Sequence, residues 1–485
     1  MNPNATLIEF ERDLAEQGIT RTGGAPLVSG NCVRILRDST ENYPAWLEAI
    51  AEARRYVLFE NYIIGKDEVG RQFVEALAKK AREGVRVRLI YDWLGSPFSG
   101  RLFRPLEEAG GEVRCFNPPR FYSPFGLLTR DHRKTVSVDG EVAFVSGLCI
   151  ARRWAGSAQR GIEPWRDTGV EIRGPSVPEI ERAFLRVWKA IGPDDAGLPL
   201  ADASPTAGNV SVMVVASEPN RGGLYRLDHF IATVARHTLW LTDAYYVGTP
   251  PYVEALRAAA HDGVDVRLLV PGSSDLPVTQ AFTRAGYRPL LEAGVRVFEW
   301  NGSMLHAKTS VADGRWARVG SSNLNVSSWL ANYELDLAVY DNDFGRQMQE
   351  MYVRDLTMST EIVLSHRKIR PREQRRVNLQ PLRGSASRAA ASALRIGNTV
   401  GAALTNRRVL TGSEAVTMAK FGAGFLVVAV LGVFFPRALA IPVALLLSWL
   451  GATLVLRAWR IRRRVQQEAA AQAEGQNRHR TSADP

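Results

Sequence analysis

The sequence contains very little cysteine. Among 485 residues there are only three, Cys32, Cys115 and Cys149. Their odd number and wide separation exclude a complete disulfide framework, and the absence of any C-x-x-C spacing excludes the usual zinc-binding motifs. The sequence therefore indicates a reducing compartment.

The N-terminus lacks the basic start and apolar run of a secretory signal peptide. Instead, its first helix-like stretch contains Glu9, Glu11, Asp13 and Glu16. We therefore expect the N-terminal segment, residues 1–30, to stay in the cytoplasm. The chain also lacks a glycine-rich phosphate loop and any cluster of side chains at metal-ligand spacing, so we expect neither a cofactor nor a metal ion.

The charge balance is basic and the composition is that of a folded protein. Lysine and arginine number 61 against 50 acidic residues, a formal net charge of +11. With 46% hydrophobic and 23% charged residues, the chain is not intrinsically disordered. The positive charge favours anionic partners, nucleic acid or acidic lipid, without choosing between them.

Long apolar runs are confined to residues 416–459, where two runs flank Pro436 and Arg437. Because both runs are apolar on every face, we expect a transmembrane hairpin, with a re-entrant loop or a buried soluble hairpin as alternatives. Both ends are predicted to be cytoplasmic, since the flanking arginines exceed the single one in the turn. They are Arg407 and Arg408 before the hairpin and Arg457, Arg460, Arg462, Arg463 and Arg464 after it.

A weak internal repeat organises the rest of the chain. The pattern V-E-A-L followed by G-V-x-V-R-L occurs at residues 74–89 and again at 253–268. Each copy predicts a helix, a glycine stop and a strand, and strands alternating with helices predict a largely parallel sheet. We expect two homologous α/β domains packed face to face with a pocket between them. The expected boundaries are residues 31–197 and 209–370 for the domains, 198–208 for a linker, 371–415 for a basic tether and 460–485 for a disordered tail.

One motif, H-x-K-x-x-x-x-D, occurs once in each copy of the repeat. Side chains two residues apart share one face of a strand, so its histidine and lysine can reach one spot. An imidazole beside an ammonium group suits a phosphate substrate. The imidazole can attack the phosphorus or deliver a proton, and the ammonium group neutralises the phosphate oxygens. All six residues are candidate catalytic residues, although we expect the two aspartates to act structurally by closing turns. They are His132, Lys134 and Asp139 in the first copy and His306, Lys308 and Asp313 in the second.

These residues resemble the motifs of the phospholipase D superfamily. His306 is followed by Gly320-Ser321-Ser322-Asn323 and by Glu334, similar to the family's G-S-x-N and trailing acid. His132 is followed by Ser146-Gly147-Leu148-Cys149 and by Asp167. Cys149 stands where the family has asparagine, which puts a phosphate contact of the first half in doubt.

The similarity extends from about residue 31 to 367, and three segments look like the bacterial cardiolipin synthase branch: residues 59–63, 131–134 and 165–170. The resemblance implies two phospholipase D-like α-β-α domains and a phosphatidyltransferase that joins two phosphatidylglycerols into cardiolipin and glycerol. The resemblance implies that the protein is located in the bacterial inner membrane, with its catalytic domains in the cytoplasm. It implies neither a nucleic-acid partner nor an obligate protein partner.

The resemblance also implies residue roles. His132 would form a phosphohistidine, and His306 would act as general acid and then general base; the reverse assignment remains open. Asp167 and Glu334 would support the imidazoles. Phosphate oxygens would be held by Lys134, Lys308, Ser321 and Asn323.

Other functions share the same motif. A phospholipase D would pass the phosphohistidine to water and a related transferase would pass it to another alcohol. A nuclease of the superfamily or a noncatalytic scaffold is also compatible with the sequence. Two further signals favour a membrane: an aromatic stretch at residues 116–125, and a basic stretch at residues 366–376.

Overall fold

The computed structural model describes residues 17–119, 129–193 and 204–364, together with seven helical positions between 441 and 455. The expected tether (371–415), the tail (460–485) and most of the expected hairpin (416–459) lie outside these residues, as does most of the aromatic stretch. Among the residues that the structure describes, no helix is both long and apolar enough to cross a membrane.

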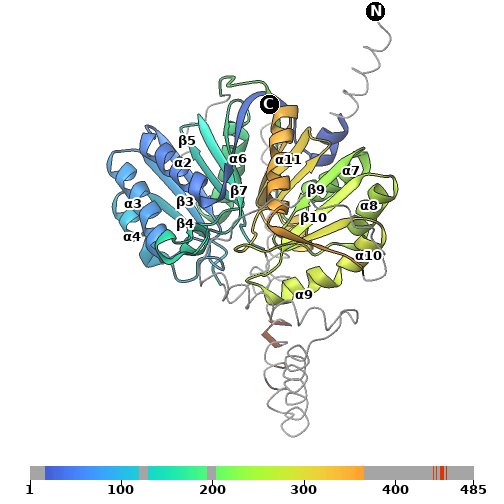
Figure 1. Ribbon diagram of the computed structural model, residues 1–485. Helices are drawn as coiled ribbons and strands as arrows, with labels where there is room; N and C mark the ends of the chain where they lie inside the picture. Colours follow the sequence, from blue (N-terminus) through green and yellow to red (C-terminus); the bar gives the residue numbers. More distant parts are fainter. Residues whose placement is uncertain are drawn as a thin grey trace, which may run out of the picture. The chain divides into compact units, whose positions relative to one another are not determined.

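Two halves of the chain repeat one order of elements (Figure 1). The first half contains β1 (Val28–Arg37), α2 (Asp38–Glu52), β2 (Tyr56–Asn61), α3 (Glu68–Arg82), β3 (Arg86–Asp92), α4 (Gly100–Glu108), β4 (Glu112–Phe116), β5 (Lys134–Val138), β6 (Val142–Ser146), α5 (Arg152–Ala155), η2 (Ala158–Arg160), β7 (Thr168–Arg173) and α6 (Val177–Ile191).

The second half follows the same plan in the green-to-orange part of Figure 1. It contains β8 (Val210–Ser217), α7 (Gly223–Val234), β9 (Thr238–Thr242), α8 (Pro250–His261), β10 (Asp265–Pro271), α9 (Pro277–Ala285), α10 (Tyr287–Glu292), β11 (Arg296–Trp300), β12 (Thr309–Ala312), β13 (Trp316–Gly320), the π-helical turn η3 (Ser327–Ala331), β14 (Glu334–Tyr340), α11 (Asn342–Leu356) and β15 (Ser359–Ile362).

The repeated sequence forms the helix, glycine stop and strand that its pattern predicts. Asp67 caps α3 by accepting hydrogen bonds from the backbone N–H groups of Val69 and Gly70 at 3.1 and 3.2 Å. The helix ends at Gly84, whose φ of +88° is a left-handed conformation that glycine adopts without a steric penalty. Gly263, with φ of +92°, ends α8 in the same way.

The expectation of a largely parallel sheet is wrong. Only β2, β3 and β4, and likewise β9, β10 and β11, run parallel; the other strand pairs of the described sheet are antiparallel. The reason is loop length: β5 and β6 are separated by the three residues 139–141, too few for the helical crossover that a parallel pair requires.

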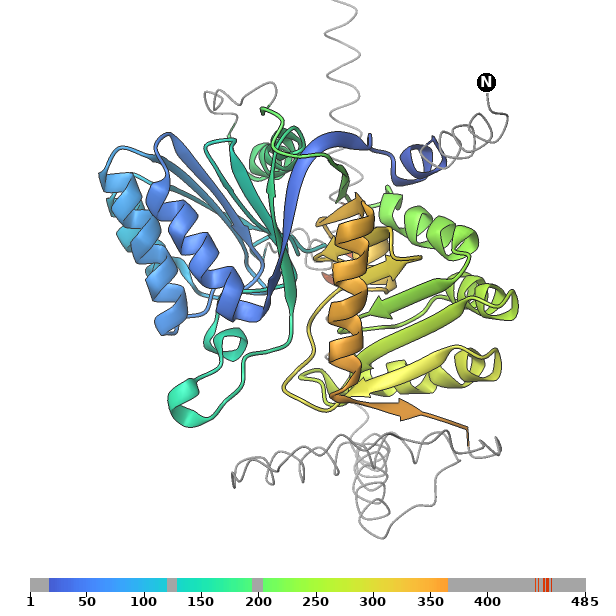
Figure 2. The same cartoon turned by 45° about the horizontal axis from the view of Figure 1, so that its top comes forward.

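The two halves are joined in two ways. Strand β1 pairs with β8, so that all fifteen strands follow one hydrogen-bonded order. The halves also pack through a shared apolar core of strands β6, β7, β8, β13 and β14, with helices α6 and α11 against it. All of these elements belong to one compact unit. Figure 2 shows α11 lying along the boundary between the two halves.

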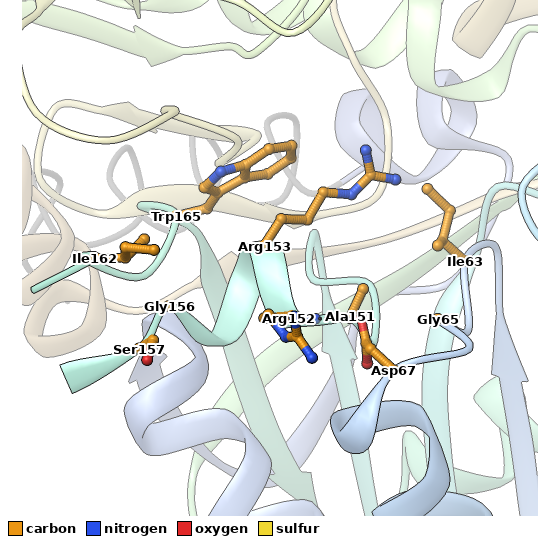
Figure 3. Close-up of a pocket in the computed structure, with 10 residues that line it drawn as sticks. All are labelled: Ile63, Gly65, Asp67, Ala151, Arg152, Arg153, Gly156, Ser157, Ile162 and Trp165. Carbon is orange, nitrogen blue, oxygen red and sulfur yellow. Dashed lines mark hydrogen bonds between the residues drawn. The ribbon is translucent and has the colours of Figure 1, made fainter. Parts of the chain in front are cut away.

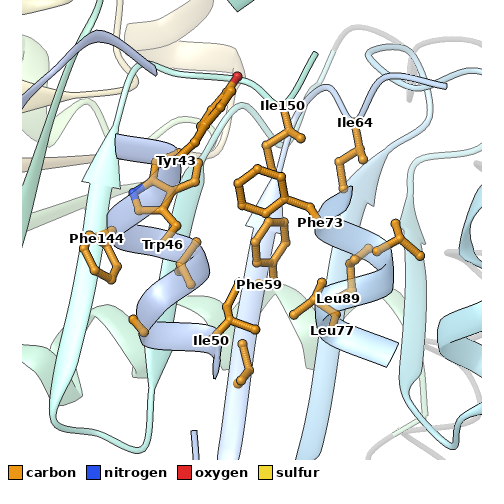
Figure 4. Packing of buried hydrophobic residues seen from close by; sticks show 14 of the residues in the cluster. Tyr43, Trp46, Ile50, Phe59, Ile64, Phe73, Leu77, Leu89, Phe144 and Ile150 are labelled. Carbon is orange, nitrogen blue, oxygen red and sulfur yellow. The ribbon is translucent and has the colours of Figure 1, made fainter. Parts of the chain in front are cut away.

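Each half has a second core under its outer helices. In the first half, helices α2 and α3 press Trp46 and Phe73 onto Phe59 of β2 (Figure 4). These large side chains are at most 1% exposed. Each fully buried aromatic side chain of this kind contributes roughly 1.5–3 kcal/mol. The packing makes the strands a rigid platform for the residues at their ends.

Candidate active site

The two histidines lie at the ends of the parallel strands and are tied to each other's halves. Lys134 pairs with Asn61, the last residue of β2, which places His132 at the carboxyl edge of that sheet. The backbone N–H of His132 donates to the carbonyl of Tyr333, 2.9 Å away, and that of His306 donates to Arg166 at 2.7 Å. Each histidine therefore lies just before its strand and is bonded to a segment from the opposite half, at the residue directly before that half's carboxylate.

His132 is paired with Glu334. Its Nδ1 lies 3.1 Å from Oε1 and 3.0 Å from Oε2 of that carboxylate, which is fully buried. Ser321 Oγ donates to Oε2 at 2.6 Å and Asn332 Nδ2 to Oε1 at 3.3 Å. Burial opposes ionisation of Glu334, but His132, Lys134 and Ser321 outweigh it and hold the pKa of this carboxyl below its usual value. An ionised Glu334 favours the tautomer in which Nδ1–H donates a hydrogen bond to the carboxylate, and this tautomer leaves Nε2 of His132 with its lone pair.

His306 is paired with Asp167. Its Nδ1 lies 2.7 Å from Oδ2 of that carboxylate, and Trp154 Nε1 donates to the same oxygen at 3.3 Å. The other oxygen accepts the backbone N–H of Thr168 at 2.8 Å. Burial raises the pKa of Asp167 to about 6, with Lys308 limiting the rise. The two carboxylates therefore differ: Glu334 is the stronger acid and Asp167 the weaker.

One motif lysine lies beside each histidine. The Nζ of Lys134 donates to the backbone carbonyl of His132, and that of Lys308 donates to the carbonyl of His306. Burial lowers the pKa of Lys308 to about 8, although Asp167 favours its charged form. The ammonium groups lie over aromatic rings, Lys134 at 5.2 Å from the centroid of Tyr62 and Lys308 at 5.7 Å from that of Tyr245.

The charges of the two halves act on one another. Burial lowers the pKa of His132, and Lys134 and Lys308 lower it further. Burial holds the pKa of His306 well below its usual value, and Lys308, Lys134 and His132 act in the same direction. The lysine of each half thus lowers the pKa of the other half's histidine. The two imidazoles and the two ammonium groups therefore form one electrostatic site.

The aspartates of the two motifs lie apart from this site, at the far end of their strands. The Asp139 carboxylate accepts hydrogen bonds from the backbone N–H groups of Arg54, Arg55 and Tyr56 at 2.7–2.8 Å. Asp313 accepts three equivalent bonds, from residues 236–238, at 2.8–2.9 Å. Each aspartate thus fixes the start of β2 or β9, which agrees with the structural role expected for it.

Ser321 and Asn323, expected at phosphate oxygens, have different surroundings. The hydroxyl of Ser321 both donates to Glu334 and accepts the backbone N–H of Leu335 at 3.0 Å, so it is engaged with the carboxylate. Asn323 is buried, and its Oδ1 has no hydrogen-bond partner among the described residues.

The replacement of serine by Gly147 in the first half has a steric reason. A Cβ at residue 147 would lie 2.3 Å from Oδ1 of Asp167, closer than any real contact. In the first half, the shorter side chain of Asp167 therefore fills the space that corresponds to the Ser321 side chain in the second half. Cys149, in place of asparagine, is buried and its backbone carbonyl accepts the Tyr43 hydroxyl at 2.6 Å.

Aromatic residues around the imidazoles were not predicted as site residues. Tyr62 meets His132 edge-on, with ring centroids 4.9 Å apart. Trp154, Trp165 and Tyr245 surround His306 at 5.1, 5.7 and 5.7 Å. Tyr62 directly follows β2, within residues 59–63, one of the segments that resemble the cardiolipin synthase branch, so it was identifiable by that position. Trp154 has no comparable signal, because only the chain's path brings it to His306.

The arrangement suits covalent transfer of a phosphoryl group. One imidazole, supported by an ionised carboxylate, presents a free nitrogen, and a second imidazole can carry a proton. The two lysines supply positive charge for the oxygens of a phosphodiester. Among the described residues no cluster of histidine, cysteine or acidic side chains is arranged to hold a metal ion.

Comparison with known proteins identifies the family. The model of the cardiolipin synthase phospholipase D-like domain matches residues 46–188 and 231–356, together more than half of the chain. A cardiolipin synthase of Alkalihalophilus pseudofirmus is 32% identical over 389 residues, covering 75% of this chain and 76% of that protein. A cardiolipin synthase of Clostridium perfringens is 30% identical over 348 residues, covering 69% of this chain and 72% of that protein.

A solved structure shows the same fold. The crystal structure of a phosphatidylserine synthase from Haemophilus influenzae matches with a TM-score of 0.57 and 14% identity, over 71% of this chain and 91% of that one. The phospholipase D-like α/β fold and the resemblance to the superfamily are thus confirmed. The chain belongs to the family of the cardiolipin synthase phospholipase D-like domain.

Proposed function

We propose that this protein is a phosphatidyltransferase of the cardiolipin synthase type, which joins two phosphatidylglycerols into cardiolipin and glycerol. The observation that carries the proposal is the crossed pairing of His132 with Glu334 and of His306 with Asp167. The names of the relatives supply the substrate, since the same site chemistry serves any phosphodiester.

In the first step, Nε2 of His132 attacks the phosphorus of one phosphatidylglycerol. A P–N bond forms, the P–O bond to the terminal glycerol breaks, and the departing oxygen takes a proton from Nε2 of His306. Glu334 stabilises the positive charge that develops on the His132 ring. We assign the nucleophile to His132, the role that the resemblance to the family implies; the pKa of its partner Glu334 lies below its usual value, because His132 and Lys134 outweigh the effect of burial.

In the second step, a hydroxyl of the second phosphatidylglycerol gives its proton to Nε2 of His306. Its oxygen attacks phosphorus, and the P–N bond breaks with its electron pair returning to His132. Cardiolipin leaves and both imidazoles regain their starting states. Because the phosphohistidine conserves the energy of the diester, no nucleotide is consumed.

The substrate itself adjusts the protonation of His306. In the free site, burial and the charge of Lys308 keep the pKa of this imidazole low. A phosphodiester held by Lys134 and Lys308 brings a negative charge that offsets the two ammonium groups. The pKa of His306 then rises, and the imidazole gains the proton that the leaving glycerol requires.

We further propose that the catalytic halves are cytoplasmic and work against the inner membrane, anchored by a hairpin at residues 416–459. Exposed apolar residues support this placement. The loop after β3 exposes 50% of Leu94 and 80% of Phe98, and the equivalent segment after β10 exposes 70% of Val278 and 62% of Phe282. Both segments follow parallel strands at the edge that bears the histidines, which suits insertion into a lipid interface.

Product analysis tests the function. Purified full-length protein is incubated with phosphatidylglycerol vesicles without added nucleotide, and we expect cardiolipin and glycerol in equal amounts. Phosphatidic acid as the main lipid product would identify a hydrolase. Plasmid nicking without lipid turnover would identify a nuclease. A trapped phosphoenzyme should be lost in His132→Ala; label retained there and lost in His306→Ala would reverse the two histidine roles.

A further inference from the structure

The first half of the molecule contains a cavity of about 550 Å³ that lies close to His306 of the second half. It is lined by Ile63, Gly65 and Asp67, which follow β2, and by part of the segment at and after α5, with Trp165 on its wall. Trp165 also contacts the His306 ring. The volume of the cavity falls within the range of ligand-binding pockets, about 300–1,000 Å³. The mechanism described above assigns it no ligand.

Arg153 carries a positive charge into this cavity and toward His306. Its guanidinium lies over the indoles of Trp154 and Trp165, 4.7 and 5.3 Å from their centroids. Figure 3 shows it between Trp165 and Ile63. Besides burial and Lys308, the charge of Arg153 also contributes to the low pKa of His306, so it acts within the active site.

Among the described residues, Arg153 forms one long ion pair and no side-chain hydrogen bond. Its carboxylate neighbour there is Asp275, whose Oδ2 lies 3.9 Å away, beyond hydrogen-bonding distance. Asp275 is held instead by the Tyr245 hydroxyl, which donates to Oδ1 at 2.7 Å. The adjacent Arg152 differs, because its guanidinium donates two hydrogen bonds to Glu68.

We propose that Arg153 and this cavity bind the phosphodiester that the acceptor lipid itself carries, a second anion distinct from the phosphorus that His132 attacks. The proposal rests on the proposed function. An acceptor phosphatidylglycerol has its own phosphate one glycerol unit away from the hydroxyl that His306 deprotonates. When that hydroxyl lies at His306, its phosphate needs a cation beside the same imidazole, and Arg153 supplies it.

The inference explains how the site selects a lipid acceptor over water or a free alcohol. Water and glycerol carry no phosphate and gain nothing from Arg153. A charge-assisted bidentate contact from arginine to phosphate is among the stronger hydrogen-bonding interactions in proteins. Arg153 should therefore affect the second step and leave the first nearly unchanged.

The experiment compares two acceptors in the full-length protein. Phosphatidylglycerol vesicles give cardiolipin, which needs an anionic acceptor. The same vesicles with labelled glycerol give labelled phosphatidylglycerol, which uses the same phosphohistidine and the same His306 with a neutral acceptor. We expect Arg153→Gln to lower cardiolipin formation about 10- to 100-fold, mainly through KM, and glycerol exchange less than about twofold.

Two variants serve as controls. Arg288→Gln removes an exposed charge on α10 that is already paired with Glu292 at 2.7 Å, away from the cavity, and should change both reactions less than about twofold. Arg153→Lys keeps a cation without the planar fork and should recover part of the cardiolipin activity.

The outcomes separate this inference from the proposed function. Equal losses of cardiolipin formation and glycerol exchange in Arg153→Gln, or no loss of either, overturn the acceptor site alone. A wild-type protein that makes no cardiolipin overturns the proposed function and the acceptor site with it.

Discussion

The imidazole of His132 and the carboxylate of Glu334 are hydrogen-bonded across 202 residues of sequence and belong to different halves of the molecule. His306 and Asp167 form the reciprocal pair across 139 residues. Neither half therefore contains a complete acid–base unit. In the proposed mechanism both halves are needed, because each half supplies the carboxylate that contacts the other half's histidine.

Removing the charge of Glu334 tests this relationship. Glu334→Gln keeps the shape of the side chain but cannot stabilise a cationic His132, so we expect kcat to fall by about a hundred- to ten-thousand-fold. Ser321→Ala, which removes the hydrogen bond to the carboxylate and the one accepted from the backbone N–H of Leu335, should cost about tenfold. Steady-state cardiolipin synthesis measures both, with thermal unfolding as a check on folding. Near wild-type turnover in Glu334→Gln would show that the pair is not catalytic.

The pH dependence of kcat/KM should be bell-shaped. Asp167 accepts a hydrogen bond best when ionised, and its raised pKa of about 6 means that activity falls as the pH drops through that value. Lys308 must be charged to hold phosphate, and its lowered pKa of about 8 means that activity falls again as the pH rises through that value. Lys308→Arg should displace the alkaline limb to higher pH. An unmoved limb would assign it to another group.

Asp139 should matter for stability more than for chemistry. Asp139→Ala leaves three backbone N–H groups at the start of β2 without their acceptor, and places alanine at a φ of +55°. We expect a loss of about 2–4 kcal/mol in the free energy of unfolding, measured by urea titration. Asp139→Asn, which tolerates this φ, should lose less. A fall in kcat of the folded protein comparable to that of His132→Ala would contradict a structural role.

Gly147 should resist even the smallest substitution. In Gly147→Ala the new Cβ meets Oδ1 of Asp167 at 2.3 Å, so the carboxylate must move and His306 loses its support. We expect at least about a tenfold loss of kcat, since orientation of a general acid is worth that much. Gly100→Ala, where a Cβ meets nothing within 4 Å, is the matched control and should be silent. Equal activity of the two variants would show that Asp167 can relax.

The exposed apolar residues at the site's edge should bind lipid. Phe98→Glu introduces a charge into the proposed contact and should weaken sedimentation of the protein with phosphatidylglycerol vesicles about tenfold. Val234→Glu is the control, because Val234 is 44% exposed at the end of α7, before β9, at the opposite edge of the sheet. If both variants lose binding equally, general charge repulsion rather than insertion of Phe98 explains the effect.

Local pattern was sufficient for the elements that bear the site. The glycine stops at Gly84 and Gly263 follow from short-range backbone preferences that tertiary packing did not override. The expected shared strand is only partly formed, since β5 begins at Lys134 and β12 at Thr309, so that both histidines precede their strands. The largely parallel sheet was predicted wrongly because helix–strand alternation ends after β4, and the short turn at Asp139 then dictates a hairpin.

The sequence by itself determined two repeats and two histidine–lysine motifs, since these are fixed by residue type and spacing. Its resemblance to the phospholipase D superfamily pointed to the two trailing carboxylates. Only the tertiary structure decided which carboxylate serves which histidine, why residue 147 is glycine, and that Arg153 and Trp154 stand beside His306. The physical reason is that hydrogen bonding and steric exclusion depend on distances of a few ångströms between residues far apart along the chain. Those distances are set by how the two halves pack, and no local pattern encodes them.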